Sequence, residues 1–160
     1  MRVLVISDIH GRIDILRRIL MKEQKAEAVF FLGDGENDID KVRFDFPEKC
    51  FYKVRGNCDW GSSSDLTGTI NLEGYKIFYT HGHMHYVKFG NTDIKETARN
   101  CYADIVLYGH THKVHNEYDN GLYIMNPGSL TNYEPSYGVI ELLEKGVLTN
   151  IIYLSPEKRW

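Results

Sequence analysis

The sequence predicts an α/β fold in which two β-sheets pack face to face and helices cover their outer faces. The first third of the chain alternates strand, helix and strand, an order typical of a parallel βαβ unit. The rest carries pairs of apolar segments separated by turn residues, which are typical of antiparallel hairpins. A length of 160 residues favours one domain, which we place over 1–160.

The N-terminal third predicts a strand, a helix and two further strands. Residues 3–6 are a short β-branched segment that predicts a buried strand ending in a polar loop. Residues 14–25 carry apolar side chains at helical spacing, with Arg and Lys between them, and predict an amphipathic helix. Residues 28–32 predict a second strand that stops at a Gly-Asp-Gly turn, and a third short strand closes at Val54.

The later part predicts three hairpins and one more helix. The turn signals are Glu73-Gly74, Asp119-Asn120-Gly121 and Glu144-Lys145-Gly146. We expect the paired strands over 69–72 and 76–79, 113–118 and 122–125, and 137–143 and 147–154. A helix over 93–102 and a buried strand over 105–108 are expected between the first two hairpins.

Composition excludes several classes of protein. The net charge is −3 and the calculated pI is about 6.1, so the chain lacks the basic footprint of a dedicated nucleic-acid binder. No segment approaches the roughly 20 apolar residues of a membrane span. The three cysteines lack paired spacing and indicate reduced thiols, so we expect a cytoplasmic protein.

Residues of metal-ligand type follow the expected strands. In α/β sheets, ligands gather outside the carboxyl ends of strands, and adjacent glycines let the backbone approach an ion closely. Asp-x-His and His-x-His spacing places both side chains on one side of an extended segment. The candidates are Asp8 and His10, Asp34, Asn57 and Asp59, His81 and His83, and His110 and His112.

These residue types limit the metal. Carboxylate, carboxamide and imidazole form a mixed oxygen and nitrogen site that suits Mn²⁺, Ni²⁺, Zn²⁺, Fe²⁺ or Co²⁺ better than Ca²⁺. Seven of these nine side chains acting as ligands would be too many for one tetrahedral ion but would fit two ions that share a carboxylate, roughly 3.5–4 Å apart. We therefore expect two divalent ions, with Mn²⁺ first among the alternatives.

The order of these motifs resembles the calcineurin-like metallophosphoesterase superfamily. The motifs are Asp8-x-His10, Gly33-Asp34, Gly56-Asn57-Cys58-Asp59, His81-Gly82-His83 and Gly109-His110-Thr111-His112. The short length, the Gly-Asn-Cys-Asp motif and Asn126-Pro127-Gly128-Ser129 are similar to its small prokaryotic phosphodiesterase branch. The resemblance implies a four-layer α/β sandwich with two central mixed sheets flanked by helices.

The resemblance also implies a ligand set. Asp8, His10 and His112 would hold one ion, Asn57, His81 and His110 the other, and Asp34 would bridge them. We prefer His81 to His83 as the ligand because it directly follows a strand and precedes glycine. His83 would then face the substrate phosphate.

The function that follows is a phosphodiesterase in which a metal-bridging hydroxide attacks phosphorus. Asn57, Asp59 and His83 are the expected catalytic residues. Many members of the superfamily carry histidine where this chain has Cys58, and a thiol is a poor replacement as a general acid. Cys58 either takes part in leaving-group chemistry or packs behind Asn57. Asn126-Pro127-Gly128-Ser129 either supports the ligands or forms a tight turn between strands.

Other readings stay open. A phosphomonoesterase, including a phosphoprotein phosphatase, would use the same site. A non-catalytic scaffold similar to a retromer subunit would show broken ligand positions. A small-molecule phosphodiester is the expected partner, a nuclease is disfavoured without a basic track, and a homo-oligomer is possible. Four aromatic residues either line a substrate cleft or pack in the core or on the surface: Trp60, Tyr86, Phe89 and Tyr133.

Overall fold

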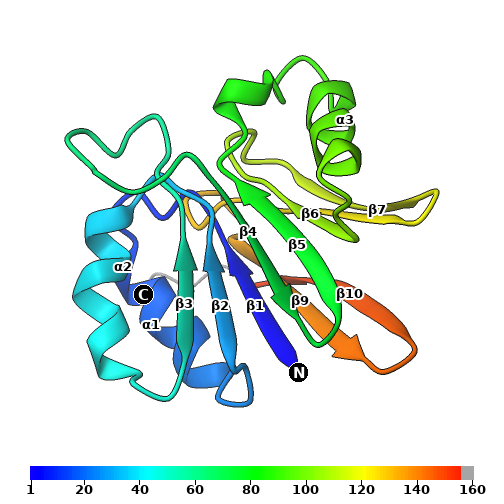
Figure 1. Cartoon of the computed structure of the whole chain (residues 1–160). Helices are drawn as coiled ribbons and strands as arrows, with labels where there is room; N and C mark the ends of the chain where they lie inside the picture. The colour runs from blue at the N-terminus through cyan, green and yellow to red at the C-terminus, as the bar shows by residue number, and fades with distance from the viewer. Residues whose placement is uncertain (156–160) are drawn as a thin grey trace.

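The computed structural model describes residues 1–155 and contains two five-stranded mixed sheets with helices on their outer faces (Figure 1). Residues 156–160, which the predicted domain includes, lie outside the described residues. The predicted four-layer sandwich is confirmed. Within the described part of the chain, no helix is long and apolar enough to cross a membrane.

The first sheet has the strand order β10-β9-β1-β2-β3. Its parallel part consists of β1 (Arg2–Ile6), β2 (Ala28–Phe31) and the edge strand β3 (Cys50–Lys53), with Val3 opposite Ala28 and Ala28 opposite Cys50. The last hairpin, β9 (Ser136–Leu143) and β10 (Gly146–Tyr153), adds to it antiparallel, with Arg2 opposite Glu141. Helices α1 (Ile13–Lys22) and α2 (Glu36–Val42) make the parallel crossovers.

The second sheet has the strand order β4-β5-β6-β8-β7. The hairpin of β4 (Thr67–Leu72) and β5 (Tyr75–Thr80) forms one edge, and β7 (Val114–Asp119) and β8 (Leu122–Pro127) form the other. Strand β6 (Ile105–Leu107) lies between them, parallel to both β5 and β8. Helix α3 (Thr92–Asn100) makes the crossover between β5 and β6.

Alternation along the strands separates three apolar layers. In β1, Leu4 and Ile6 pack against α1, while Val3 and Val5 face the other way and meet Ile77 and other residues of the second sheet. On the outer face of the second sheet, side chains of β5 and β6 pack against α3. The central layer fixes the two sheets against each other, and this contact places their strand ends at one edge of the molecule.

Most predicted elements are present with shifted ends. Helix α1 ends at Lys22 rather than at residue 25, because the N–H of Glu23 closes the last turn and the chain then leaves the helix. Helix α2 and the short 3₁₀ helices Arg43–Asp45 and His83–His85 were not predicted. The three hairpins form at the predicted turns.

Candidate metal centre

Five strands deliver the predicted ligands to one edge of the molecule. Figure 1 shows the arrowheads of β1, β2, β3 and β5 pointing toward the same end. The loops after β1, β2 and β3 carry Asp8, His10, Asp34 and Asn57, and those after β5 and β6 carry His81, His110 and His112. The site therefore draws its residues from both sheets.

One group of ligand atoms gathers around Asp8. His112 Nε2 lies 3.0 Å from Asp8 Oδ1, and His10 Nε2 lies 3.8 Å from the same oxygen. Asp8 is fully buried, whereas His10 and His112 are partly open to solvent. These are the three residues that the family resemblance assigns to one ion, and the structure brings them together.

A second group gathers around His81. Its Nε2 lies 3.1 Å from Asn57 Oδ1 and 3.1 Å from His110 Nδ1. The Nδ1–H of His81 donates to the carbonyl of Leu32 at 2.6 Å, which turns Nε2 toward the other ligands. These three residues are the set that the family resemblance assigns to the other ion.

Asp34 lies between the two groups. Its Oδ2 is 3.7 Å from His10 Nε2 and 3.5 Å from His81 Nε2, while its Oδ1 accepts the backbone N–H of Cys58 at 2.8 Å. Although burial opposes the charged form, His81 and the Cys58 N–H hold the pKa of Asp34 well below its usual range. An ionised Oδ2 is thus presented to both groups.

The charge balance fits divalent cations. Asp8 and Asp34 are buried carboxylates, and Asp8 Oδ1 has no aligned hydrogen-bond donor, although it lies near the imidazole nitrogens of His10 and His112. A buried carboxylate oxygen without a partner is costly unless a cation faces it. Burial lowers the pKa of His81, but Asp34 and Asp8 outweigh burial and raise it, so the cluster attracts positive charge. The residues present therefore fit two metal ions, one in each group.

His83 is beside this cluster rather than in it. Its ring centroid is 5.4 Å from that of His81 and 6.0 Å from that of His110. His83 lies in a 3₁₀ helix that starts immediately after Gly82, whereas His81 continues directly from β5. Burial and the positive charge of His81 lower the pKa of His83, so it is neutral near pH 7. The placement agrees with the preference for His81 as the ligand.

Five of the predicted ligands have left-handed backbone conformations. Asp8, His10, Asp34, His110 and His112 have φ between 43° and 65°. Non-glycine residues rarely adopt this region, and such strain persists only where the surroundings over-determine it. Its concentration in residues of one cluster indicates that the loops are shaped to aim these side chains.

Asp59 organises the backbone behind the ligands, a role that its sequence motif did not predict. Its carboxylate accepts four backbone N–H groups, from Asp34, Gly35, Glu36 and Gly56, at 2.7–2.8 Å. It therefore ties the loop after β2 to the loop that carries Asn57. The structure places Asp59 behind Asp34, where it orients ligands through the backbone.

The Asn126-Pro127-Gly128-Ser129 segment supports the ligands from behind. Asn126 Nδ2 donates to the carbonyl of Gly109 at 2.8 Å, and Ser129 Oγ donates to the carbonyl of Asp8 at 3.0 Å. Further along, Asn132 Nδ2 donates to the carbonyl of His112 at 2.7 Å. These contacts favour the hypothesis that the segment supports the ligands over the hypothesis that it is only a tight turn between strands.

Cys58 faces the cluster. Its thiol is exposed, lies with ligand atoms of His10 and Asp34 inside a 4.8 Å group, and accepts a hydrogen bond from Asn57 Nδ2 at 3.2 Å. Desolvation and the carboxylate of Asp34 raise the pKa of this thiol to about 11. Packing behind Asn57 does not describe this position, and a thiol with that pKa is a weak general acid at neutral pH.

One cavity is lined by a predicted ligand, a second borders the loop that carries two others, and the two cavities share no lining residue. The first, about 350 Å³, is lined by Asn57, His83 and Trp60 among others. The second, about 630 Å³, is lined by Thr111, between His110 and His112, and by residues from the segment after β5. Trp60 is 90% exposed and lines the first cavity; Tyr86, Phe89 and Tyr133 are also exposed, so none of the four aromatics is in the core.

The calcineurin-like phosphoesterase superfamily domain matches residues 1–145 of the chain. The chain belongs to this superfamily. The probable metallophosphoesterase YsnB of Bacillus subtilis is 32% identical over 130 residues, covering 81% of this chain and 75% of YsnB. The phosphodiesterase YfcE of Escherichia coli K12 is 27% identical over 168 residues, covering 88% of each chain.

A solved structure has the same fold. The crystal structure of a predicted phosphoesterase from Streptococcus pneumoniae TIGR4 matches with a TM-score of 0.78 and 27% identity, covering 95% of this chain and 88% of that one. As a member of the superfamily, the chain is a metal-dependent phosphoesterase.

A vacuolar protein sorting-associated protein is also among the relatives. Vacuolar protein sorting-associated protein 29 of Schizosaccharomyces pombe is 36% identical, but only over 92 residues, which are 58% of this chain and 49% of that protein. The scaffold reading predicted broken ligand positions. In this chain all seven predicted ligands are present and gathered, so the site favours the enzyme.

Proposed function

We propose that the chain is a phosphodiesterase that uses two divalent cations. Asp8, His10 and His112 would hold one, Asn57, His81 and His110 the other, and Asp34 would be shared. The observation that carries the proposal is the position of Asp34 Oδ2, within 3.7 Å of His10 Nε2 and 3.5 Å of His81 Nε2. One carboxylate oxygen within reach of both groups can be shared by two ions about 3.5–4 Å apart, which is the spacing used in two-metal phosphoryl transfer.

When bound, the two cations supply Lewis acidity at the phosphate oxygens and lower the pKa of coordinated water from 15.7 toward about 7. The chain's own residues orient this chemistry. Asp59 holds the backbone of Asp34 and Gly56, and Leu32 fixes the ring of His81. His83 and Asn57 line one cavity, where a neutral imidazole can donate a hydrogen bond to a phosphate oxygen or a leaving group.

The two adjoining cavities support a diester rather than a monoester substrate. A phosphate diester carries two substituents, and each cavity offers space for one of them. A monoester would use only one cavity. The 27% identity to a relative named phosphodiesterase supports the same choice.

The proposal extends to metal, partner and location. The mixed carboxylate, amide and imidazole set suits Mn²⁺, with Ni²⁺, Zn²⁺, Fe²⁺ and Co²⁺ as alternatives. Cavities of about 350 and 630 Å³ fit a small-molecule diester. All three cysteines are free, which supports a reducing, cytoplasmic environment.

Activity of the full chain loaded with Mn²⁺ tests the proposal. We expect faster hydrolysis of bis(4-nitrophenyl) phosphate than of 4-nitrophenyl phosphate, and two metal ions per chain by elemental analysis. Asp34→Asn should lower kcat/KM by more than about 100-fold, because even loss of a ligand's supporting partner costs 10–100-fold.

Asp45→Asn is the matched control, because Asp45 is an exposed residue paired with Arg17 away from the cluster. It should keep metal content and rate. Near-normal turnover in metal-loaded Asp34→Asn would overturn the shared-ligand proposal. If the wild type hydrolysed 4-nitrophenyl phosphate faster than bis(4-nitrophenyl) phosphate, the chain would be a phosphomonoesterase rather than a phosphodiesterase.

A further inference from the structure

The larger of the two cavities has a chemistry that phosphate hydrolysis alone does not require. Its volume is about 630 Å³, and its walls come from the segment after β5, from Tyr108 just after β6, from the loop leading into β7 and from the start of β7. Thr111 lines this cavity and lies in the chain between the predicted ligands His110 and His112, so the cavity borders the loop that carries both. A substituent of a phosphate bound at the centre can therefore extend into it.

The cavity is lined by two lysines and by no acidic residue. Lys88 and Lys113 are exposed, and within residues 1–155 neither forms an ion pair. Lys53 and Lys95, by contrast, are each paired with carboxylates. In a chain of net charge −3, two unpaired cations lining one cavity make it a local site of positive potential.

The wall of the cavity beside Lys113 is held by a hydrogen-bonded chain of side chains, and the carboxylate in this chain is already paired with other residues. The Tyr108 hydroxyl is 2.7 Å from His115 Nδ1, and His115 Nε2 lies 3.0 Å from Glu117. Lys95 pairs with the same Glu117 at 3.0 Å. Glu117 is thus paired with His115 and Lys95, and the two lysines that line the cavity stay available for a ligand.

We propose that this cavity binds an anionic group carried by one ester substituent, so that the substrates are phosphodiesters with a second negative charge, phosphate or carboxylate. This inference rests on the proposed phosphodiesterase function. Two lysines offer point charges to such a group, while Tyr108 and Val87 supply apolar wall for the linking carbons. The smaller cavity beside Asn57 and His83 is then left for the other substituent.

Kinetics on matched diesters with Mn²⁺-loaded full chain test the assignment. The probes are 4-nitrophenyl propyl phosphate, 4-nitrophenyl 3-carboxypropyl phosphate and 4-nitrophenyl 3-phosphonopropyl phosphate, which share one leaving group. We expect kcat/KM about tenfold higher for at least one anionic arm than for propyl. The arm that is faster identifies the anion.

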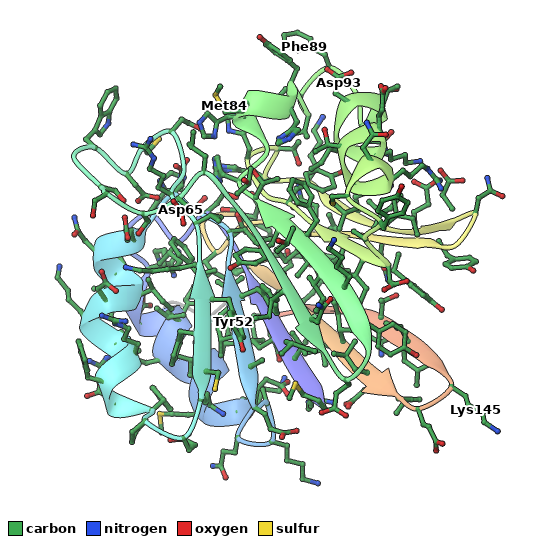
Figure 2. All side chains as sticks on the ribbon, viewed as in Figure 1. Tyr52, Asp65, Met84, Phe89, Asp93 and Lys145 are labelled. Atoms are coloured by element: carbon green, nitrogen blue, oxygen red, sulfur yellow. The ribbon has the colours of Figure 1, made fainter. Side chains whose placement is uncertain are left out.

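The lysines are tested by the double variant Lys88→Met, Lys113→Met, in which the preference for the anionic arm should fall to about one. Lys145→Met is the control, because Lys145 is exposed at the tip of the β9–β10 hairpin. Figure 2 places it far from Phe89 and Asp93, which lie near the segment that lines the cavity. Equal rates on all three arms, or a preference that survives the double substitution, would overturn the inference.

Binding without turnover separates this inference from the proposed function. In metal-free protein, 3-hydroxypropylphosphonate should shift the amide NMR signals of Lys88, Thr111 and Lys113, and the double variant should lose these shifts. Signal shifts without diester hydrolysis would support the anion site and contradict the phosphodiesterase function. Diester hydrolysis without these shifts and without the kinetic preference would support the phosphodiesterase function and contradict the anion site.

Discussion

Gly56 has no side chain, and its backbone lies directly against the Asp34 carboxylate. A Cβ built on Gly56 would lie 2.0 Å from Asp34 Oδ1 and 2.5 Å from the Asp34 nitrogen. Separations this short cannot exist between real atoms, so any larger residue would displace Asp34 or the loop that carries Asn57. The glycine before Asn57 is therefore required for close approach of two ligand-bearing loops.

Gly56→Ala should lower metal affinity sharply while the sheets stay folded. The shift of Asp34 separates its oxygens from both groups of ligands, so we expect at least about tenfold weaker Mn²⁺ binding by calorimetry. Gly138→Ala is the matched control, because its Cβ would meet the Met125 sulfur at 2.3 Å inside the β-sheet core. It should lower thermal stability and keep Mn²⁺ affinity. Unchanged Mn²⁺ affinity in Gly56→Ala would contradict the claim that the close approach of Gly56 keeps Asp34 in place as a ligand.

At the residue scale, the ligands could be predicted from sequence but much of their support could not. Asp8, Asp34 and His81 stand next to strands in a recognisable order. The role of Asp59 depends on four N–H groups, three of which lie more than 20 positions earlier in the chain. The signal available was its place in the Gly-Asn-Cys-Asp motif, which does not distinguish a catalytic carboxylate from one that organises backbone.

At the scale of elements, a buried lysine joins α1 to β3. The side chain of Lys49, just before β3, is fully buried. Its Nζ donates to the carbonyls of Glu23, Gln24 and Ala26 at 2.7–3.1 Å. These carbonyls follow the end of α1, where a cation complements the helix dipole and satisfies free acceptors.

Lys49→Met should destabilise the fold by about 2 kcal/mol, because it leaves buried carbonyls without a donor. For a domain of this size, that corresponds to roughly 4–8 °C in Tm by calorimetry. Lys41→Met is the control on an exposed position of α2 and should change Tm by far less. If Lys49→Met lowered Tm no more than Lys41→Met, water would be donating to the carbonyls in place of the Lys49 ammonium. Metal binding should be retained in both variants.

The missed helix α2 shows where element prediction from sequence reaches its limit. Its seven residues place only Ile39 and Val42 as apolar side chains in the core, too few for a periodic signal. Tertiary contacts supply the rest, since Lys53 of β3 binds Glu36 and Asp40 on this helix. The hairpins were predictable because their turn residues determine backbone conformation locally: Glu73 and Asn120 both adopt positive φ.

At the scale of the whole molecule, the metal centre bridges the two sheets. Asp8, Asp34 and Asn57 follow strands of the first sheet, and His81 and His110 follow strands of the second. Besides any metal, the sheets meet through the central apolar layer, through hydrogen bonds such as that of the Tyr75 hydroxyl to the carbonyl of Leu143, and through contacts at this edge, such as that of the His110 N–H with Asp8. Ions held by residues from both sheets would add to these contacts only in the folded state.

Metal removal should therefore lower the stability of the entire fold. A ligand that binds only folded protein at about 1,000 times its Kd contributes about 4 kcal/mol, which corresponds to roughly 8–16 °C in Tm here. We expect this difference between Mn²⁺-loaded and EDTA-treated chain by calorimetry, and a much smaller one for Asp34→Asn. Hydrogen exchange should slow on metal binding in the loops after both β2 and β5, since ligands from the two sheets become linked. Protection confined to one sheet would mean that the ions do not bridge them, and the shared role of Asp34 would have to be abandoned.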